Sequence, residues 1–137
     1  MQYKFHAYGH QNILATHKTT LEFTKDEKLS SNGNCIVGVK ADFDLDILKN
    51  FIKNCKNKKI KIMIEYGSKK IKETVEAELN SDFNDDKEIV IRKTGFVSER
   101  TFAINADKAA FELKSDLIRF LKDKKNKISV VIKNKEV

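Results

Sequence analysis

The segment from Tyr8 to Thr20 is the part of the chain richest in side chains that could do acid–base or hydrogen-bonding chemistry. It holds two histidines, and an imidazole can take up or release a proton near neutral pH. The asparagine and threonines beside them can hydrogen-bond a ligand. With one residue from the next predicted turn, the candidate ligand-binding residues are Gly9, His10, Asn12, Thr16, His17, Thr20 and Asn34.

His17 and Gly9 each have a structural and a functional interpretation. If Ile13 to Thr24 forms one strand, His17 shares an apolar face with Leu21, because side chains alternate along a strand. A histidine on such a face commonly bonds its ring nitrogens to backbone or hydroxyl partners, whereas the functional interpretation makes His10 or His17 an acid or base. Gly9 is either a bulge or corner, or a point where a ligand approaches the backbone closely.

The sequence lacks the patterns of a metal site or an activated nucleophile. His6, His10 and His17 are spread through extended chain and a turn, which predicts that their rings point to differing sides. Cys35 and Cys55 have no CxxC spacing, and Cys35 begins an apolar run that is typical of inert buried cysteine. Phosphate loops and dinucleotide fingerprints are also missing. We therefore predict no catalytic residue, no metal and no cofactor, and favour a protein without enzymatic activity.

The chain is basic, with 27 Lys plus Arg against 20 Asp plus Glu in 137 residues, a formal net charge of +7. Nearly all of the cations are lysines, which are solvated point charges that attract phosphate without reading sequence. Many of these lysines lie directly after the two predicted helices. There they either keep the protein soluble or form a surface that binds a partner. The candidate nucleic-acid-binding residues are Lys56, Lys58, Lys59, Lys122, Lys124, Lys125 and Lys127.

An internal repeat organises the chain. The segment Cys35–Asp42 is similar to Arg100–Asp107 at an offset of 65, and Lys58–Ile64 is similar to Asn126–Ile132 at an offset of 68. The difference between the two offsets, three residues, falls in a turn or at the end of a helix, where the chain can change its length at little cost in free energy. The equivalence also predicts that the two lysine clusters flank one another symmetrically.

Hydrophobic periodicity predicts the same order of elements in residues 1–68 and 69–137: strand, strand, strand, helix, strand. Asp42 or Asp44 can cap the first helix, and the second begins at about Lys108. Neither half is long enough to form a core readily by itself, so we expect one domain. The predicted fold class is β-rich α+β, a pseudo-two-fold β-sandwich or closed sheet with mostly antiparallel strands and two helices over its ends or edges.

Several short motifs together resemble a known family. They are Gly9-His10-x-Asn12, Ala15-Thr16-His17, Gly33-x-Cys35-Ile36-x-Gly38 and Ala106-Asp107-Lys108-Ala109-Ala110. They are similar to the archaeal domain-of-unknown-function family numbered 371, over nearly the whole chain. The resemblance implies an archaeal cytosolic protein with a β-rich fold, and it implies no activity. The family pattern has proline where Gln11 stands, aspartate where Asn34 stands, and a second Gly-His near Asn80.

Three hypotheses about function follow. The leading one is a non-enzymatic binding domain for an anionic partner, with RNA or DNA ahead of a small anionic ligand. The second is a small-molecule-binding protein or enzyme with a His/Thr site between Gly9 and Thr20. The third is a structural or assembly protein that uses an exposed sheet edge. Two unpaired cysteines and the lack of a leader or of ~20 consecutive apolar residues predict a cytoplasmic protein without a membrane partner.

Overall fold

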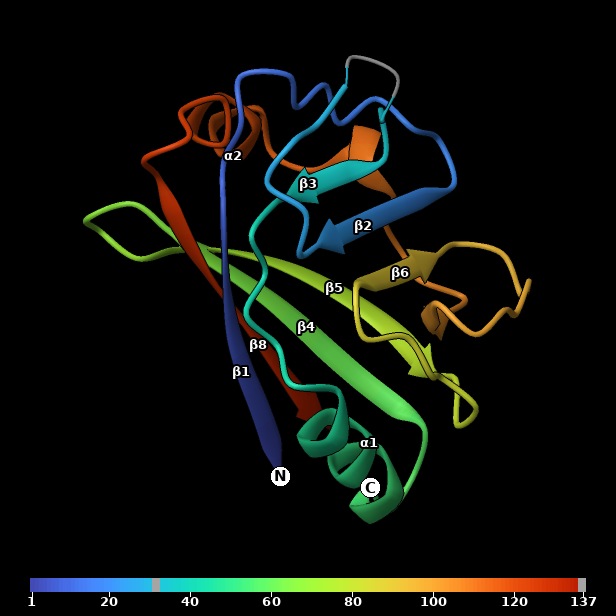
Figure 1. Ribbon diagram of the computed structural model, residues 1–137. Coiled ribbons are helices and arrows are strands. Elements are labelled where there is room, and N and C mark those ends of the chain that lie inside the picture. Colours follow the sequence, from blue (N-terminus) through green and yellow to red (C-terminus); the bar gives the residue numbers. More distant parts are fainter. Residues whose placement is uncertain (31–32, 136–137) are drawn as a thin grey trace.

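The computed structural model describes residues 1–30 and 33–135 (Figure 1). The described strands are β1 (Gln2–Tyr8), β2 (Thr20–Thr24), β3 (Ile36–Gly38), β4 (Lys59–Tyr66), β5 (Ile71–Leu79), β6 (Glu88–Arg92), β7 (Thr101–Ile104) and β8 (Lys127–Asn134). The helices are α1 (Leu45–Asn54) and α2 (Ser115–Phe120), with a 3-10 turn η1 (Ala110–Glu112) before α2. The prediction of a β-rich chain with two helices is confirmed. Among these residues, no helix is long and apolar enough to cross a membrane.

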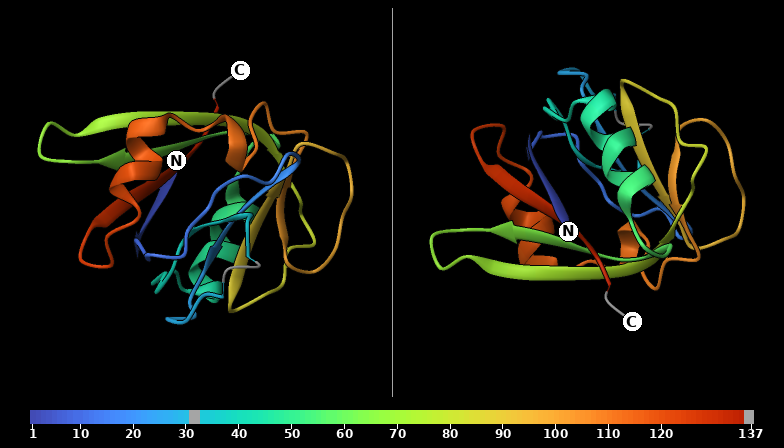
Figure 2. Two further views of the ribbon diagram at one scale, coloured as in Figure 1. Left: turned by 90° about the horizontal axis from the view of Figure 1, so that it is seen from above. Right: turned by 90° about the horizontal axis from the view of Figure 1, so that it is seen from below.

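The described strands form a single mixed sheet in the order β1-β8-β4-β5-β7-β6-β2-β3. Pairing is antiparallel except between β2 and β3 and between β6 and β7, which confirms the mostly antiparallel prediction. The two ends of this order approach each other at one isolated bridge between Tyr8 and Val39. A sandwich or a closed sheet is not confirmed, since the sheet is open apart from that bridge. The turn between β4 and β5 projects from the molecule in every view (Figure 2).

Alternation along the long strands places one face of the sheet in the core. Ile60, Ile62 and Ile64 of β4 are fully buried, and the residues between them are only half-buried. Because β8 pairs with β4, Ile132 and Val130 meet them on the same face. Burying each of these side chains contributes about 2 kcal/mol, so the pairing of β4 with β8 helps to hold the two halves of the chain together.

Helix α1 begins where the sequence predicted it. Asp44 caps the helix by accepting a hydrogen bond from the Ile47 amide at 3.0 Å. Asp42, the alternative cap, instead accepts from the His6 amide at 2.6 Å and ties the segment before α1 to β1. Leu48 and Phe51 face the core as the periodicity predicted.

The second predicted helix is interrupted. The backbone at Leu113 and Lys114 is extended, which separates η1 from α2. The Lys114 amide donates to the buried carboxylate of Glu73 at 3.3 Å, so a contact with β5 replaces a helical hydrogen bond. The periodicity of this segment predicts that Ala110, Leu113, Leu117, Phe120 and Leu121 point inward. All of these are buried except Phe120, which is half-buried.

The predicted strand from Ile13 to Thr24 is wrong in its first half, since the strand begins only at Thr20. The ring Nδ1 of His17 accepts hydrogen bonds from the Thr19 and Thr20 amides at 3.2 and 3.1 Å. Such local bonds compete with strand pairing and hold the chain in a turn. His17 therefore lies in a loop and is half-buried, and the alternation argument does not apply to it.

The two lysine clusters lie far apart, contrary to the expectation that they flank one another. One precedes β4 and the other precedes β8, and these strands are antiparallel neighbours, with Ile60 opposite Asn134. The starts of the strands are therefore at opposite ends of the sheet, about 25 Å apart for eight residues of extended chain. Figure 1 shows α1 and α2 at these opposite ends.

Candidate anion-binding pockets

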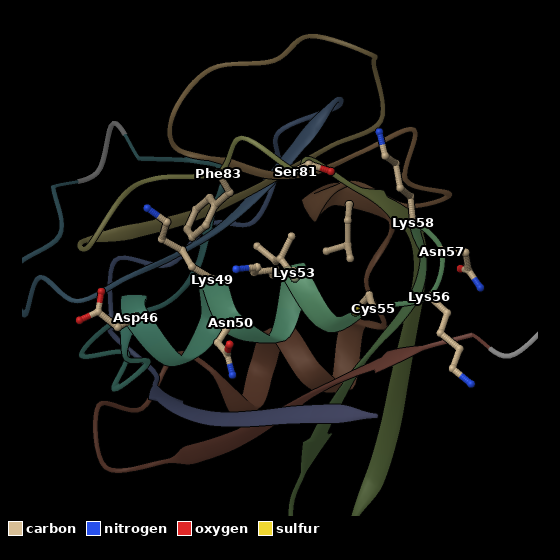
Figure 3. Close-up of a pocket in the computed structure, with 12 residues that line it drawn as sticks. Asp46, Lys49, Asn50, Lys53, Cys55, Lys56, Asn57, Lys58, Ser81 and Phe83 are labelled. Atoms are coloured by element: carbon tan, nitrogen blue, oxygen red, sulfur yellow. The ribbon is translucent and has the colours of Figure 1, made fainter.

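A pocket of about 700 Å³ lies beside α1. It is formed by one face of α1, by the turn that leads into β4 and by the segment that follows β5. Its lining residues are Asp46, Lys49, Asn50, Ile52, Lys53, Cys55, Lys56, Asn57, Lys58, Leu79, Ser81 and Phe83. In Figure 3, Lys49 and Lys53 project from the side of α1 that lies below Phe83, and Lys56 and Asn57 project from the turn after the helix.

Helical spacing and side-chain hydrogen bonds position these lysines. Lys49 and Lys53 are four residues apart in α1 and thus share one side of the helix. The turn after the helix is held in place because the Lys56 amide donates to Asn134 Oδ1 at 3.1 Å. The Asn57 side chain also donates to the Lys135 carbonyl at 2.7 Å. Both bonds anchor the turn to the end of β8.

The pocket carries four lysines and one aspartate. Lys49 donates to the side-chain oxygen of Asn84 at 3.2 Å. Within residues 1–30 and 33–135, the ammonium groups of Lys53, Lys56 and Lys58 form no salt bridge or hydrogen bond with protein. Each of these groups has three donors that only water or an added anion can satisfy. The pocket is therefore a site of unneutralised positive charge.

The floor of this pocket is apolar. Phe83 and Leu79 are buried, and Phe83 packs edge-on against Phe102 with ring centroids 5.4 Å apart. Burial raises the pKa of the Cys55 thiol above its ordinary value, so this thiol stays protonated and is a poor nucleophile at neutral pH. The chemistry available here is electrostatic binding above a hydrophobic floor.

A second pocket, of about 590 Å³, lies near α2 at the other end of the sheet. Its lining residues are His10, Gln11, Arg119, Lys122, Asp123 and Lys124. The Lys122 ammonium donates to the Ile13 carbonyl at 2.6 Å, and Arg119 pairs with Asp116 at 3.2 Å. One candidate histidine and two candidate lysines, assigned from the sequence to different functions, are thus brought together.

The remaining candidates of the Gly9 to Thr20 segment lie elsewhere. The amides of Thr16 and His17 both donate to the Asn34 carbonyl, at 3.0 and 3.1 Å. These residues form one loop cluster that leads into Thr20, the first residue of β2, and in it the His17 Nδ1 already accepts backbone bonds. The Asn12 side chain donates to the Leu29 carbonyl at 2.7 Å and so joins two loops. The segment therefore does not form one site around both histidines.

The lysine candidates also divide. Lys56 and Lys58 line the pocket beside α1, and Lys122 and Lys124 line the one near α2. Lys59 borders a shallow depression that contains Glu76, Glu78 and Asp107, a mainly acidic surrounding. The other two candidates, at positions 125 and 127, are exposed.

The sequence analysis missed a cluster of ionisable groups around Glu22 on β2. Glu22 is only 4% exposed, and its Oε1 lies 3.7 Å from both the Arg100 guanidinium and the Cys35 thiol. Burial, with a smaller contribution from the nearby charge of Glu88, raises the pKa of Glu22 to about 7. Burial and Glu22 raise the pKa of Cys35 to about 11, so this thiol is protonated at neutral pH. Period-two alternation alone predicts an exposed Glu22 and gives no signal for this cluster.

Comparison with known proteins gives a family but no activity. The chain matches the model of the family described as Domain of unknown function (DUF371) over residues 5–135. A protein of Methanocaldococcus jannaschii, named only as uncharacterized, is 38% identical over 135 residues, which cover 96% of this chain and 99% of that protein. The extent of both matches agrees with the motif resemblance found in the sequence.

Proposed function

The chain belongs to the DUF371 family, and we propose that it is a non-enzymatic binding domain for an anionic partner, with RNA or DNA as the favoured partner. The observation that supports this proposal is the pocket beside α1, where Lys53, Lys56 and Lys58 have no protein partner among the described residues. Lysines in this state attract phosphate groups and exchange bound counterions for them.

The character of the pocket favours a nucleic acid over a small ligand. A small-molecule site usually surrounds its ligand and fixes it with a few well-placed polar groups. Here the ammonium groups of Lys53, Lys56 and Lys58 have no bond to protein, among the described residues, that would fix their positions. Exposed ammonium groups without protein partners suit a phosphate backbone, which needs charge and no precise geometry.

The test is fluorescence anisotropy with labelled mixed-sequence RNA and DNA oligomers, from low to physiological salt. For the unaltered protein we expect log affinity to fall linearly with log salt. The variant K56E/K58E should lower the affinity at low salt at least tenfold. It should also make the salt slope shallower by about 1.4, because each single-strand phosphate that a lysine neutralises adds about 0.7 to the slope.

The matched control is K69E/K70E, which makes the same change of charge on the exposed turn between β4 and β5. It should change the affinity much less than K56E/K58E does. Equal decreases in affinity for both variants would mean that net charge, and no particular surface, drives binding. No binding of any oligomer at low salt would refute the proposal.

We also infer that the two halves of the chain are structural repeats. In the first half, the Ala41 amide donates to the Thr24 carbonyl at 2.9 Å, and in the second the Ala106 amide donates to Arg92 at 3.0 Å. The following aspartates repeat a second contact: the Asp42 side chain accepts from the His6 amide, and the Asp107 side chain accepts from the Glu76 amide at 3.0 Å. These matched bonds support a duplication.

Two free cysteines support a cytoplasmic location, since a reducing compartment keeps thiols unpaired.

A further inference from the structure

We propose that the pocket near α2 is a separate site for a small ligand that carries a phosphate monoester. The proposal rests on the way in which His10 is held beside the basic residues 119–124, and it does not depend on nucleic-acid binding beside α1.

His10 is held with one ring nitrogen free to donate. Its backbone amide donates to the Leu121 carbonyl at 2.8 Å, which fixes the turn after β1 against the end of α2. Its Nδ1 accepts a hydrogen bond from the Asn12 amide at 3.0 Å. A neutral imidazole that accepts at Nδ1 carries its proton on Nε2, so Nε2 is a donor directed by the rest of the ring.

Gly9 makes this close approach possible. A Cβ atom at this position would collide with the carbonyl oxygens of Leu121 and Asp123. The Gly9 amide also donates to the Asn126 carbonyl at 2.9 Å. The chain therefore passes directly over the turn between α2 and β8, and His10 follows at the mouth of the pocket.

Three cations line the pocket together with His10. Lys122 is held by its bond to the Ile13 carbonyl, so its charge has a defined position. Arg119 bonds Asp116 through one of its nitrogens and keeps other guanidinium donors. Lys124 is exposed and forms no salt bridge within the described part of the chain. The carboxylate of Asp123 opposes them, but it already accepts the Lys125 amide at 2.9 Å.

This combination of groups suits a phosphate monoester. The lining supplies three cations and the Asp123 carboxylate, and Asp116 pairs with Arg119, so one net positive charge remains to attract a phosphate group. The Nε2–H adds a neutral, directional donor to a phosphate oxygen. The planar guanidinium of an arginine can donate two parallel hydrogen bonds to a phosphate group, and the ammonium group of a lysine adds a compact positive charge. The volume of about 590 Å³ exceeds what a bare phosphate fills and leaves room for a small organic group. No aromatic residue lines the pocket among the residues that the structure describes, so stacking on a base is not expected.

The test is NMR titration of ¹⁵N-labelled protein with inorganic phosphate and, separately, with glycerol 3-phosphate. We expect chemical-shift changes at residues 10–11 and 119–124 and at the His10 ring Nε2, with tighter binding of the monoester than of phosphate. K124E should weaken binding at least tenfold, and K125E, the same charge change one residue outside the pocket lining, should weaken it less than threefold.

H10Q tests the role of the imidazole, because an amide side chain keeps a donor but alters its position. It should weaken binding at least fivefold, while the spectrum away from residues 9–13 and 119–126 confirms that the variant is folded. K56E/K58E should bind the monoester as the unaltered protein does. Shift changes confined to the pocket beside α1, equal weakening in K124E and K125E, or no saturation below 50 mM would each overturn this proposal. None of these outcomes is the oligomer result that would refute the proposed function, so the two can fail separately.

Discussion

Glu22 makes folding stability depend on pH in an unusual direction. Most carboxylates in proteins are stabilised in their charged form, but burial raises the pKa of Glu22 from 4.5 to about 7. The folded protein therefore binds this proton more tightly than the unfolded chain does. The proton on Glu22 therefore adds to the free energy of unfolding. This stabilisation is fully present below about pH 4.5, and it is lost as the pH rises through 7.

The magnitude follows from the size of the shift. A difference of 2.5, from 4.5 to about 7, corresponds to about 3 kcal/mol at 1.36 kcal/mol per unit. Arg100 is 47% exposed and brings solvent close to the carboxyl group, so we expect about 2 kcal/mol to be observed. In the folded protein the Cys35 thiol stays protonated throughout, because its pKa is about 11. Its partial ionisation in the unfolded chain near pH 8.5 is common to the two proteins that are compared.

Glu22→Gln removes the titration while preserving shape. Urea unfolding followed by circular dichroism, at intervals from pH 4.5 to 8.5, gives the free energy of unfolding of each protein. From pH 4.5 to pH 8.5, the free energy of unfolding of the variant should rise by about 2 kcal/mol relative to that of the unaltered protein. Glu27→Gln, at an exposed residue, should leave the difference constant. A constant difference for Glu22→Gln, or one that favours the unaltered protein more strongly at high pH, would mean that Glu22 does not bind its proton more tightly in the folded protein.

Two further substitutions test the packing and the helix cap. Gly9→Ala should lower the free energy of unfolding by about 3 kcal/mol, because the added methyl group collides with the backbone carbonyl oxygens of Leu121 and Asp123. The control is Gly95→Ala, whose methyl group would make only an ordinary contact with Asn105. It should change the free energy of unfolding by less than about 1 kcal/mol. Asp44→Ala should lower the free energy of unfolding by about 1 kcal/mol, because it removes the hydrogen bond from the Ile47 amide that caps α1. Urea unfolding at pH 7 measures this change. An unchanged free energy of unfolding would mean that the protein does not need this cap.

Local pattern was sufficient for the regular elements. Alternation predicted β4, because Ile60, Ile62 and Ile64 all face one core, and a period of about 3.6 with an acidic cap predicted α1. The pattern failed where side chains bond to backbone. The His17 ring replaces strand pairing before Thr20, and such a bond leaves no trace in hydrophobic periodicity.

The candidate sites depended on pairing between distant segments. The lysines after the two helices are similar in sequence, but antiparallel pairing of β4 with β8 places them at opposite ends of the sheet. The fold also places His10 beside Lys122 and Lys124, which no spacing in the sequence suggests. Two separate pockets therefore replace one continuous basic surface.

Residue types and their spacing were enough to predict a basic, β-rich chain with two helices, family motifs, and strands whose buried faces follow alternation. Which ionisable groups act on one another depends on the folded arrangement. Arg100 is far along the chain from Glu22 and Cys35, and the altered pKa values of these groups arise from burial and from charges only a few ångströms away. Such energies fall steeply with distance and rise as water is excluded, so they appear only when the folded chain has brought the groups together.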